Sequence, residues 1–323
     1  MKTNILILSA GRRVELVQDF KTEATKFSDE IKIYCTDINP HMSSACHMAD
    51  GAFSVTRIDD PNYIDEIFAL AQKENIGLII PTIDTELQKL ADNRERFAAA
   101  GIHIIISDSD LISLCRDKRR TTALFQQYGI NSPEIYRRDD ITFPCFAKPY
   151  DGSRGIGAQA VNDPSELTPE LLNDPKIMFC QLIDIQNTFK EFTVDIYYDK
   201  NGVAKCIVPR ERLEVRSGEV SKGATRRNYL YDLLVTQLGK LDGARGCLTT
   251  QFFYHDESQT VYGVEINPRF GGGFPLTYAS GANYINWLIR EYLYNEEIPF
   301  FDQWKNDLIM LRYDAKVLVH EHD

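Results

Sequence analysis

The sequence lacks the features that mark several large classes of protein. No apolar run approaches the roughly 20 residues that cross a bilayer, and the opening run Ile5–Leu8 is too short for a secretory core. The seven cysteines are scattered, odd in number and without a C-x-x-C pair, which argues against a disulfide framework or a structural zinc site. Acidic residues outnumber basic ones by 47 to 36, which argues against a general nucleic-acid or membrane binder. We therefore expect a soluble, cytoplasmic protein with no nucleic-acid or membrane partner.

Common nucleotide-binding motifs are missing as well. Neither a Walker sequence, G-x-x-x-x-G-K-[ST], nor a protein-kinase signature occurs. The turn after the first apolar run reads Ser9-Ala10-Gly11-Arg12-Arg13 instead of G-x-G-x-x-G, so the pyrophosphate cradle of a dinucleotide domain is missing. A G-x-G-x-x-A string at Gly155–Ala160 has no long amphipathic helix after it. These absences argue against P-loop, kinase-type and dinucleotide-dependent enzymes.

The first third of the chain alternates buried strands with helices. Apolar strands are predicted at Ile5–Leu8, Ile31–Thr36, Gly77–Pro81 and Ile102–Ile106, and helices at Arg12–Lys26, Asp60–Glu74 and Thr85–Ala100. This alternation predicts a doubly wound parallel sheet over residues 1–108. Arg12 and Arg13 follow the first strand at its carboxyl end, where such sheets bind ligands. They either hold an anionic substrate or are solvated.

The middle of the chain contains a glycine-rich loop between two predicted strands. The strand Cys145–Pro149 carries Lys148 near its end, and the loop Tyr150–Gly157 follows it. Such a loop can fold over a triphosphate and donate backbone N–H groups, while a lysine reaches phosphate oxygens as a point charge. The apolar strand Met178–Ile183 comes next, and backbone groups at such an edge can pair with an adenine.

Strands with one polar face are predicted in the last third. Glu265 and Asn267 are two residues apart on the strand Thr260–Asn267, so they share a face and offer the oxygen ligands that suit Mg²⁺. Gln251, on a preceding antiparallel strand, could lie beside them. Arg269 then supplies a cationic fork for phosphate oxygens. The alternative is a surface strand that ends in a glycine turn, Gly271–Gly273.

A further basic segment, residues 214–227, is predicted to be a loop. It is rich in arginine, lysine, glutamate and glycine. Two interpretations stay open from the residues alone. The segment is either a solvated loop or a loop that faces a phosphate or carboxylate substrate.

The ordered set of motifs resembles the ATP-grasp superfamily, and most closely the stand-alone proteins similar to the carbamoyl-phosphate synthase large subunit. The set comprises Asp117-Lys118, Lys148 with its glycine loop, a hinge strand, Glu191, Gln251 and Glu265-x-Asn267-Pro268-Arg269. The resemblance covers nearly the whole chain. It implies an α/β amino-terminal doubly wound parallel sheet followed by an α+β ATP-grasp fold with antiparallel sheets. The implied units are a Rossmann-like domain at 1–108, a small subdomain with the glycine loop at 109–187 and a large subdomain with the metal site at 188–323.

The resemblance also implies roles for individual residues. The implied ATP ligands are Lys118, Lys148, Gly152, Ser153, Gly155 and Gly157 at the phosphates, Gln181 and Ile183 at the adenine, and Glu191 at the ribose. The implied Mg²⁺ ligands are Gln251, Glu265 and Asn267, with Glu265 bridging two ions and Mn²⁺ as a substitute. Gln251 stands where many relatives have an aspartate or glutamate, which leaves the second ion open. Arg269 and Lys148 would be catalytic.

The chemistry implied by the resemblance is an ADP-forming carboxylate–amine ligation through an acyl phosphate. The partners would be a small-molecule carboxylate and an amine, and a homodimer is common in similar proteins. Two alternatives stay open, namely a kinase-like or carboxylate-activating enzyme of the same fold and a non-catalytic nucleotide-binding protein. Specificity is expected in residues 216–227, near Arg12 and Arg13, and beside Gly271–Gly273, with those glycines next to the acyl-phosphate acceptor.

Overall fold

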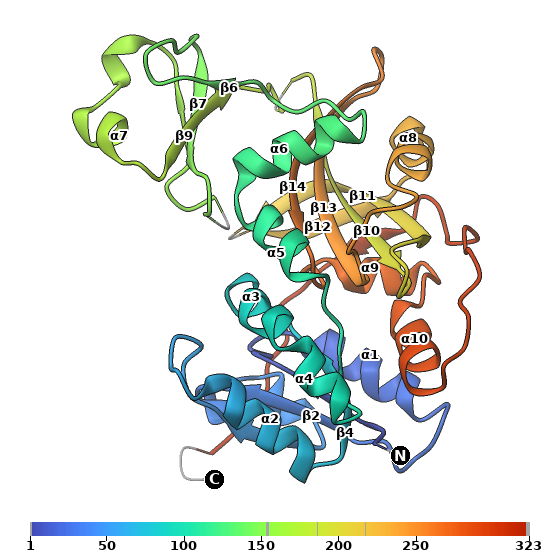
Figure 1. The fold of residues 1–323 in the computed structure, drawn as a ribbon. Coiled ribbons are helices and arrows are strands. Elements are labelled where there is room, and N and C mark those ends of the chain that lie inside the picture. Colours follow the sequence, from blue (N-terminus) through green and yellow to red (C-terminus); the bar gives the residue numbers. More distant parts are fainter. Residues whose placement is uncertain (1, 153–154, 186, 217, 321–323) are drawn as a thin grey trace.

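The computed structural model describes residues 2–152, 155–185, 187–216 and 218–320, and these residues form three β-sheets (Figure 1). A parallel sheet is built from the amino-terminal part of the chain, and two antiparallel sheets follow it. The smaller antiparallel sheet projects away from the rest of the molecule, as Figure 1 shows. The predicted fold class is therefore confirmed. None of the described helices is long and apolar enough to cross a membrane.

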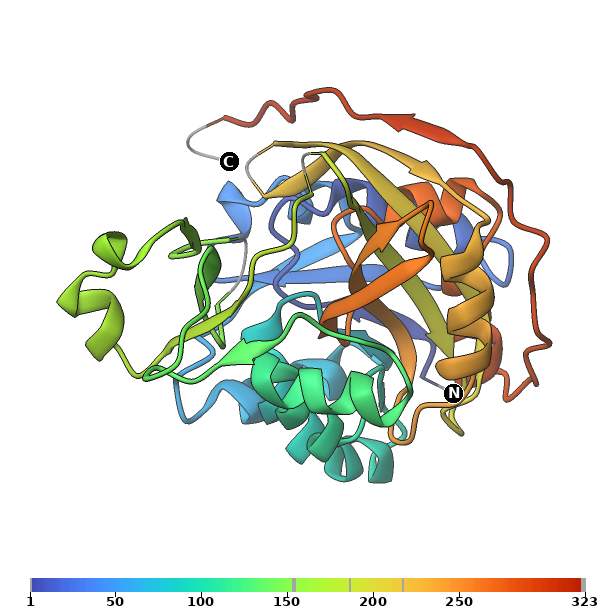
Figure 2. The ribbon, with the colours of Figure 1, turned by 90° about the horizontal axis from the view of Figure 1, so that it is seen from above.

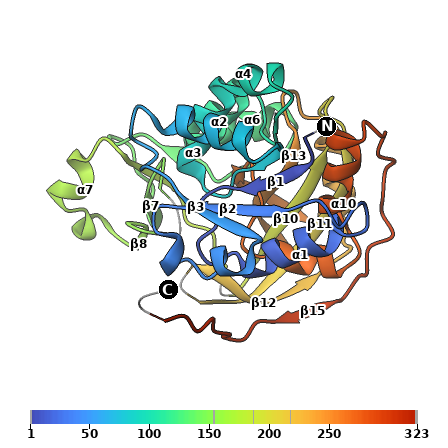
Figure 3. The same cartoon turned by 90° about the horizontal axis from the view of Figure 1, so that it is seen from below.

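The parallel sheet has five strands in the order β3-β2-β1-β4-β5. Its strands are β1 (Asn4–Ile7), β2 (Ile33–Asp37), β3 (Gly51–Ser54), β4 (Ile76–Ile80) and β5 (His103–Ile104). Helix α1 (Val14–Ala24) covers one face, and α2 (Tyr63–Lys73), α3 (Asp84–Asp92) and α4 (Arg94–Ala99) cover the other (Figure 3). The central strands are continuously apolar because both of their faces are covered. The predicted helix 85–100 is interrupted at Asn93, and the edge strand β3 was not predicted.

Two helices lead from the parallel sheet to the small antiparallel sheet. They are α5 (Ser109–Arg116) and α6 (Lys118–Gln127). The small sheet has the order β6-β9-β7-β8, with β6 (Ile135–Tyr136), β7 (Cys145–Pro149), β8 (Gln159–Val161) and β9 (Ile177–Gln181). Helix α7 (Pro169–Asn173) lies between β8 and β9 in the chain. The small sheet has a hydrophobic core of its own around Ala147 and Phe179, separate from the main core.

The large antiparallel sheet has the order β14-β13-β10-β11-β12-β15. Its strands are β10 (Lys190–Tyr198), β11 (Ala204–Arg216), β12 (Glu219–Thr225), β13 (Gly246–His255), β14 (Thr260–Asn267) and β15 (Ile309–Leu311). The prediction of a loop over residues 214–227 was wrong, because most of this segment extends β11 and forms β12. The many charged residues of this segment favoured the loop prediction. In the structure, Val220 and Ala224 are buried on the inner face of β12.

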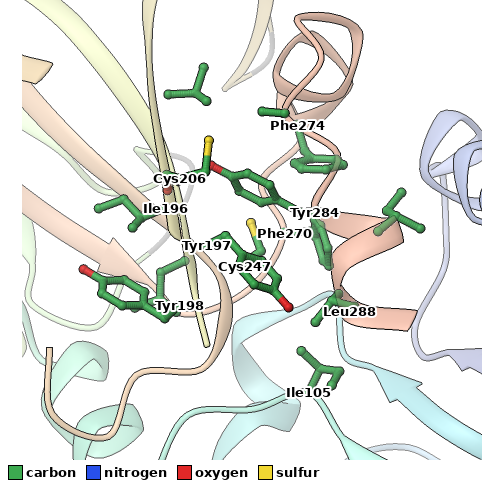
Figure 4. Packing of buried hydrophobic residues seen from close by; sticks show 14 of the residues in the cluster. Ile105, Ile196, Tyr197, Tyr198, Cys206, Cys247, Phe270, Phe274, Tyr284 and Leu288 are labelled. Atoms are coloured by element: carbon green, nitrogen blue, oxygen red, sulfur yellow. Dashed lines mark hydrogen bonds between the residues drawn. The ribbon is translucent and has the colours of Figure 1, made fainter. Parts of the chain in front are cut away.

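One continuous hydrophobic core joins the parallel sheet to the large sheet. Figure 4 shows Ile105, which follows β5, near Tyr197 of β10 and Leu288. The covering helices are α8 (Tyr229–Gln237), α9 (Phe274–Ala279) and α10 (Tyr284–Leu288), with a π-helical turn, η4 (Ile289–Leu293). The predicted single helix 276–295 is therefore divided. After β15 the chain runs along the outside of β12 toward the parallel sheet (Figures 2 and 3), where Arg312 pairs with Glu15 at 3.4 Å.

Candidate active site

A cavity of about 1130 Å³ is lined by residues of all three sheets and their loops. Thr82 and Asp84 come from the segment between β4 of the parallel sheet and the start of α3, and Lys148 comes from the small sheet. Glu191 and Glu265 come from the large sheet. The cavity therefore lies where the carboxyl ends of the parallel strands meet the polar face of the large sheet. This is the position at which open parallel sheets bind ligands.

Strands β13 and β14 bring the predicted metal ligands together. Gln251 and Glu265 are directly opposed across the ladder, and the amides of Gln251 and Asn267 donate to the same Glu265 oxygen, Oε1, at 2.8 and 2.9 Å. Lys118 Nζ lies 3.1 Å from Oε2 of Glu265. One carboxylate and two amide oxygens form a hard donor set that fits Mg²⁺, provided that phosphate and water complete the shell.

Two lysines from different elements face the phosphate side of this set. Lys118, at the start of α6, donates to the Gly152 carbonyl oxygen at 2.6 Å and so ties the glycine loop to Glu265. Lys148 lines the cavity and forms no ion pair among the described residues. Burial lowers the pKa of Lys148, while Cys180 and Glu265 oppose that effect. A lysine without a carboxylate partner is well suited to bind phosphate oxygens.

The opposite end of the cavity is more apolar. Phe146, Leu182 and Ile183 line it from the small sheet and the segment after β9, together with Gln181. Glu191 lies nearby on β10, with Arg212 Nε at 3.3 Å from its Oε2. Burial raises the pKa of Glu191, and the Arg212 charge opposes the rise. Such an end can accept a flat aromatic ring, with one carboxylate available for hydroxyl groups.

The glycine loop enters the site only in part. Gly152 and Gly155 line the cavity, but Gly157 is exposed and is not among the lining residues. Gly155 and Gly157 have φ of 70° and 73°, a conformation that glycine adopts without strain. Ser153, which was also predicted to contact phosphate, lies outside the described residues.

Arg269 is held by a residue of the parallel sheet. Its Nε and Nη2 donate to the two carboxylate oxygens of Asp84 at 2.8 and 2.7 Å. Asp84 begins α3, immediately beyond β4, so this pair spans the boundary between the parallel sheet and the large sheet. A bidentate pair fixes both the position and the plane of the guanidinium. Arg269 is thereby oriented beside Asn267, whose Oδ1 lies 3.5 Å from its Nη2.

A buried ion pair supports the floor of the cavity. Arg210 and Asp195 are almost fully buried, and Arg210 Nε donates to Asp195 Oδ2 at 3.0 Å. Thr249 and Thr277 donate to the same carboxylate at 2.8 and 2.6 Å. Gly271 and Gly273 lie directly over this cluster. A Cβ at Gly271 would be 2.8 Å from the Thr249 side chain, and one at Gly273 would clash with Arg210 Nη1.

Comparison with known proteins matches the two ends of the chain to family models. Residues 5–105 match the PylC-like N-terminal domain, and residues 187–311 match ATP-grasp in the biosynthetic pathway with Ter operon. The second match includes Glu191, Gln251, Glu265 and Asn267. The carboxyl-terminal part of the chain is therefore similar to an ATP-grasp domain.

Among curated proteins, the chain is similar to carbamoyl phosphate synthase large chains. That of Campylobacter jejuni is 22% identical over 252 residues, covering 69% of this chain and 22% of the relative. That of Thermomicrobium roseum is 26% identical over 265 residues, covering 74% of this chain and 24% of the relative. The chain thus spans less than a quarter of the length of these relatives.

Solved structures with a similar fold cover almost the whole chain. The biotin carboxylase domain of Hydrogenobacter thermophilus 2-oxoglutarate carboxylase, in complex with MgADP and bicarbonate, has a TM-score of 0.71 at 17% identity and covers 95% of this chain and 73% of its own. The L-amino acid ligase from Bacillus licheniformis has a TM-score of 0.66 at 17% identity and covers 90% and 74%. At such identities these likenesses show the fold alone.

Three residues of the candidate site were not identified from the sequence. Asp84 lies four residues after the end of a buried strand, which was the available signal for a residue at the ligand-binding edge of the parallel sheet. Asp195 and Arg210 alternate with apolar residues on neighbouring strands, and this pattern is also typical of a solvated face. Only the pairing of β10 with β11 places these two charges on the same side of the sheet.

Proposed function

We propose that the protein is an ATP- and Mg²⁺-dependent carboxylate–amine ligase that releases ADP and phosphate. The observation that carries the proposal is the cavity in which Glu265, with its two amide neighbours, lies between Lys118 and Arg269. The cavity would suit a nucleoside triphosphate. Its phosphates would lie by the cations and the metal-binding carboxylate, and its base would lie at the apolar end. Glu191 would bind the ribose there.

The reaction would take two steps. A substrate carboxylate oxygen attacks the γ-phosphorus of ATP, the bond to the β-phosphate oxygen breaks, and ADP leaves. The nitrogen of an amine then attacks the acyl carbon, phosphate leaves with the bonding electrons, and the amine loses a proton. Mg²⁺ held by Glu265, Asn267 and Gln251 would neutralise charge on the phosphates. Lys148 and Arg269 would bind the transferring group, and Gly152 and Gly155 would cover it.

The donor set supports one Mg²⁺ ion more strongly than two. Glu265 is its only carboxylate, since Gln251 and Asn267 contribute neutral amides. Ligand charge is a main determinant of affinity for a hard cation. We propose that a second ion binds only with ATP, when phosphate oxygens replace the missing carboxylate, and that Mn²⁺ substitutes for Mg²⁺.

The test is a screen for ADP release by the purified protein against amino acids and small carboxylates, with and without amines. We expect release to require a carboxylate and an amine together, and both Glu265→Gln and Lys148→Ala to lower it by about 100-fold or more, as the loss of a charged contact to the transferring group predicts. Glu257→Gln is a matched control, because Glu257 is exposed in the turn between β13 and β14. Near-normal rates in either site variant would contradict the proposed site.

The assembly and the division of the chain are also proposals. We infer three units at 1–108, 109–187 and 188–323, and a homodimer. Sedimentation measurements would test the dimer. Limited proteolysis would test the boundaries, with cleavage expected near residues 109 and 187 before any cleavage inside the sheets.

A further inference from the structure

Six cationic side chains line the cavity among the described residues, and four of them already have a carboxylate partner. The pairs are Lys118 with Glu265, Arg210 with Asp195, Arg212 with Glu191, and Arg269 with Asp84. Lys148 and Arg13 line the same cavity, and neither forms an ion pair within the described part of the chain. The proposed ligase function assigns Lys148 to ATP. Arg13 is therefore a cation in the site that has no assigned role.

Arg13 is held in place by a buried network of the parallel sheet. It precedes α1, and its Nη2 donates to the Thr82 carbonyl oxygen at 3.0 Å. The turn at Thr82 is fixed in turn by Glu86, a fully buried carboxylate that accepts from Thr82 N and from Ser9 Oγ, each at 2.7 Å. The guanidinium is thus positioned in the cavity by backbone rather than by a counter-ion.

The surroundings of Arg13 favour the binding of an anion. Burial, and then the like charge of Arg269, lower the pKa of Arg13 to about 10. A partly desolvated cation beside a second cation is unfavourable until a negative group joins it. Three carboxylates oppose this effect, and each already has other partners: Glu219 pairs with Arg12 and Arg312, Asp84 pairs with Arg269, and Glu86 holds the Thr82 turn. An anionic ligand group would supply the missing partner.

A carboxylate faces the same part of the cavity from the large sheet. Glu219, at the start of β12, lines the cavity and is close enough to act on the Arg13 charge. Its ion pairs with Arg12 and Arg312 are long, at 3.4 and 3.5 Å, and its side chain is 37% exposed. Gly272 lies beside it, since a Cβ there would be 3.5 Å from the Glu219 carboxyl carbon. Glu219 can therefore accept from a bound ammonium group.

We propose that one substrate is an α-amino acid, whose carboxylate is bound by Arg13 and whose ammonium group is bound by Glu219. The inference rests on the proposed ligase function and narrows its substrate class. Arg13 belongs to the parallel sheet and Glu219 to the large sheet, so the pair of charges exists only in the assembled chain. Arg269 is close enough to act on the Arg13 charge. The amino acid would therefore bind beside the phosphoryl group that Arg269 is proposed to hold.

The first experiment is a thermal-shift screen of the whole chain, run without nucleotide and with Mg²⁺ plus a non-hydrolysable ATP analogue. The probes are the 20 standard L-amino acids, their D enantiomers and ornithine. Each amino acid that stabilises the protein is compared with the amine that lacks its carboxyl group and with the acid that lacks its amino group. We expect stabilisation by an amino acid and not by either truncated compound. The absence of stabilisation by every amino acid, in both arms, would overturn the proposal.

The second experiment measures affinity for that amino acid in single variants. Arg13→Gln and Glu219→Gln should each weaken binding by about ten- to 100-fold, as loss of a charge-assisted hydrogen bond predicts, and Arg13→Lys should recover part of the loss. Affinity for the ATP analogue should stay unchanged in Arg13→Gln while affinity for the amino acid falls, a separation that a merely structural defect would not produce. Arg57→Gln and Glu214→Gln serve as matched controls, with no change in affinity expected. Both residues are exposed, and they pair with Asp59 and Lys222 respectively.

The two proposals fail in different ways. If the wild-type protein does not bind the ATP analogue, the ligase function is contradicted. The amino-acid titration without nucleotide would still decide the role of Arg13. Unchanged amino-acid affinity in both Arg13→Gln and Glu219→Gln, in proteins that melt at the wild-type temperature, would overturn the amino-acid site alone. Weakened affinity in both variants supports it.

Discussion

Glu265 shows how much one side chain can organise at the residue scale. Its two oxygens accept from Gln251, Asn267 and Lys118, which come from two strands and a helix. A carboxylate with this many donors is held in one orientation before any ligand binds. The sequence predicted Glu265 and Asn267 as a pair because a strand places alternate residues on one face. The contribution of Lys118, 147 positions earlier by residue number, depended on the tertiary structure.

Gly273 is a residue whose identity is determined by what lies beneath it. A Cβ at this position would clash with Arg210 Nη1 and would lie 2.8 Å from Val220 Cγ1. Arg210 is fully buried and paired with Asp195, so it cannot move aside easily. We expect Gly273→Ala to lower the free energy of unfolding by about 1–3 kcal/mol, the usual cost of overpacking. Urea denaturation would measure the change.

The adjacent glycine is the matched control. A Cβ at Gly272 would meet Glu219 at 3.5 Å, which is an ordinary contact. Gly272→Ala should therefore change the free energy of unfolding by less than about 0.5 kcal/mol, as substitutions without a clash usually do. Equal losses in both variants would show that the clash with Arg210 is not the cause.

At the scale of the element, helix α1 contains an acidic residue in an unfavourable position. Oδ2 of Asp19 is buried without a hydrogen-bond partner among the described residues. Burial, followed by the charges of Glu15 and Glu23, raises the pKa of Asp19 to about 7. The folded chain therefore favours the protonated form. That preference stabilises the fold below the unfolded pKa of 3.8 and is lost as the pH rises through about 7.

The substitution Asp19→Asn should remove this pH dependence. At pH 8 the variant should be more stable than the wild type by about 1–2 kcal/mol, because it no longer carries a partly buried charge. The gain should be clearly smaller at pH 5, where the wild-type carboxyl group is already protonated. Urea denaturation at both pH values would measure this. Asp29→Asn, at an exposed site, should give the same small effect at both, and a pH-independent gain in Asp19→Asn would refute the explanation.

Elements with a single strong pattern were predicted well, and elements with mixed signals were not. Strands β7 and β14 were predicted with their observed bounds, because apolar or alternating residues stand between clear turn signals. Strand β12 was taken for a loop because its charged residues outweigh two buried apolar ones. The helix predicted at 276–295 is interrupted, since helical periodicity continues across the breaks that packing imposes.

At the scale of the whole molecule, the parallel sheet takes part in the site through Asp84. This residue holds Arg269 in a bidentate pair across the boundary with the large sheet. The shared hydrophobic core keeps the two sheets in register, as the contact region of Ile105 and Leu288 shows (Figure 4). The small sheet has a separate core and lies to one side. We therefore expect the Arg269 side of the cavity to be more rigid than the glycine-loop side.

Removing the Asp84 carboxylate should uncouple the parallel sheet from catalysis. In Asp84→Asn, Arg269 loses its bidentate partner and is left close to Arg13, so we expect ADP release to fall by about 100-fold, as misplacement of a catalytic group predicts. Affinity for the ATP analogue should stay within about two-fold, because Lys118 and Lys148 are unchanged. Steady-state kinetics and calorimetric titration would measure both.

The control for this variant is Asp65→Asn. Asp65 also pairs with an arginine of the amino-terminal part, Arg96 at 2.6 Å, but both side chains are exposed and neither lines the cavity. Exposed ion pairs contribute little, so its ADP release and stability should match the wild type. Full activity in Asp84→Asn would show that Arg269 does not need the pair.

The sequence by itself determined the alternation of strands and helices, the strand that carries Glu265 and Asn267, and the order of the nucleotide-binding motifs. These features depend on local periodicity and spacing, which are written in neighbouring residues. The tertiary structure alone decided which charges are neutralised, because ion pairs such as Asp84 with Arg269 join residues 185 positions apart. It also separated Arg12, 79% exposed, from Arg13 in the cavity. Two adjacent arginines are equivalent in the sequence, and only the packing of the sheets around them makes one a surface charge and the other a ligand-binding group in our proposal.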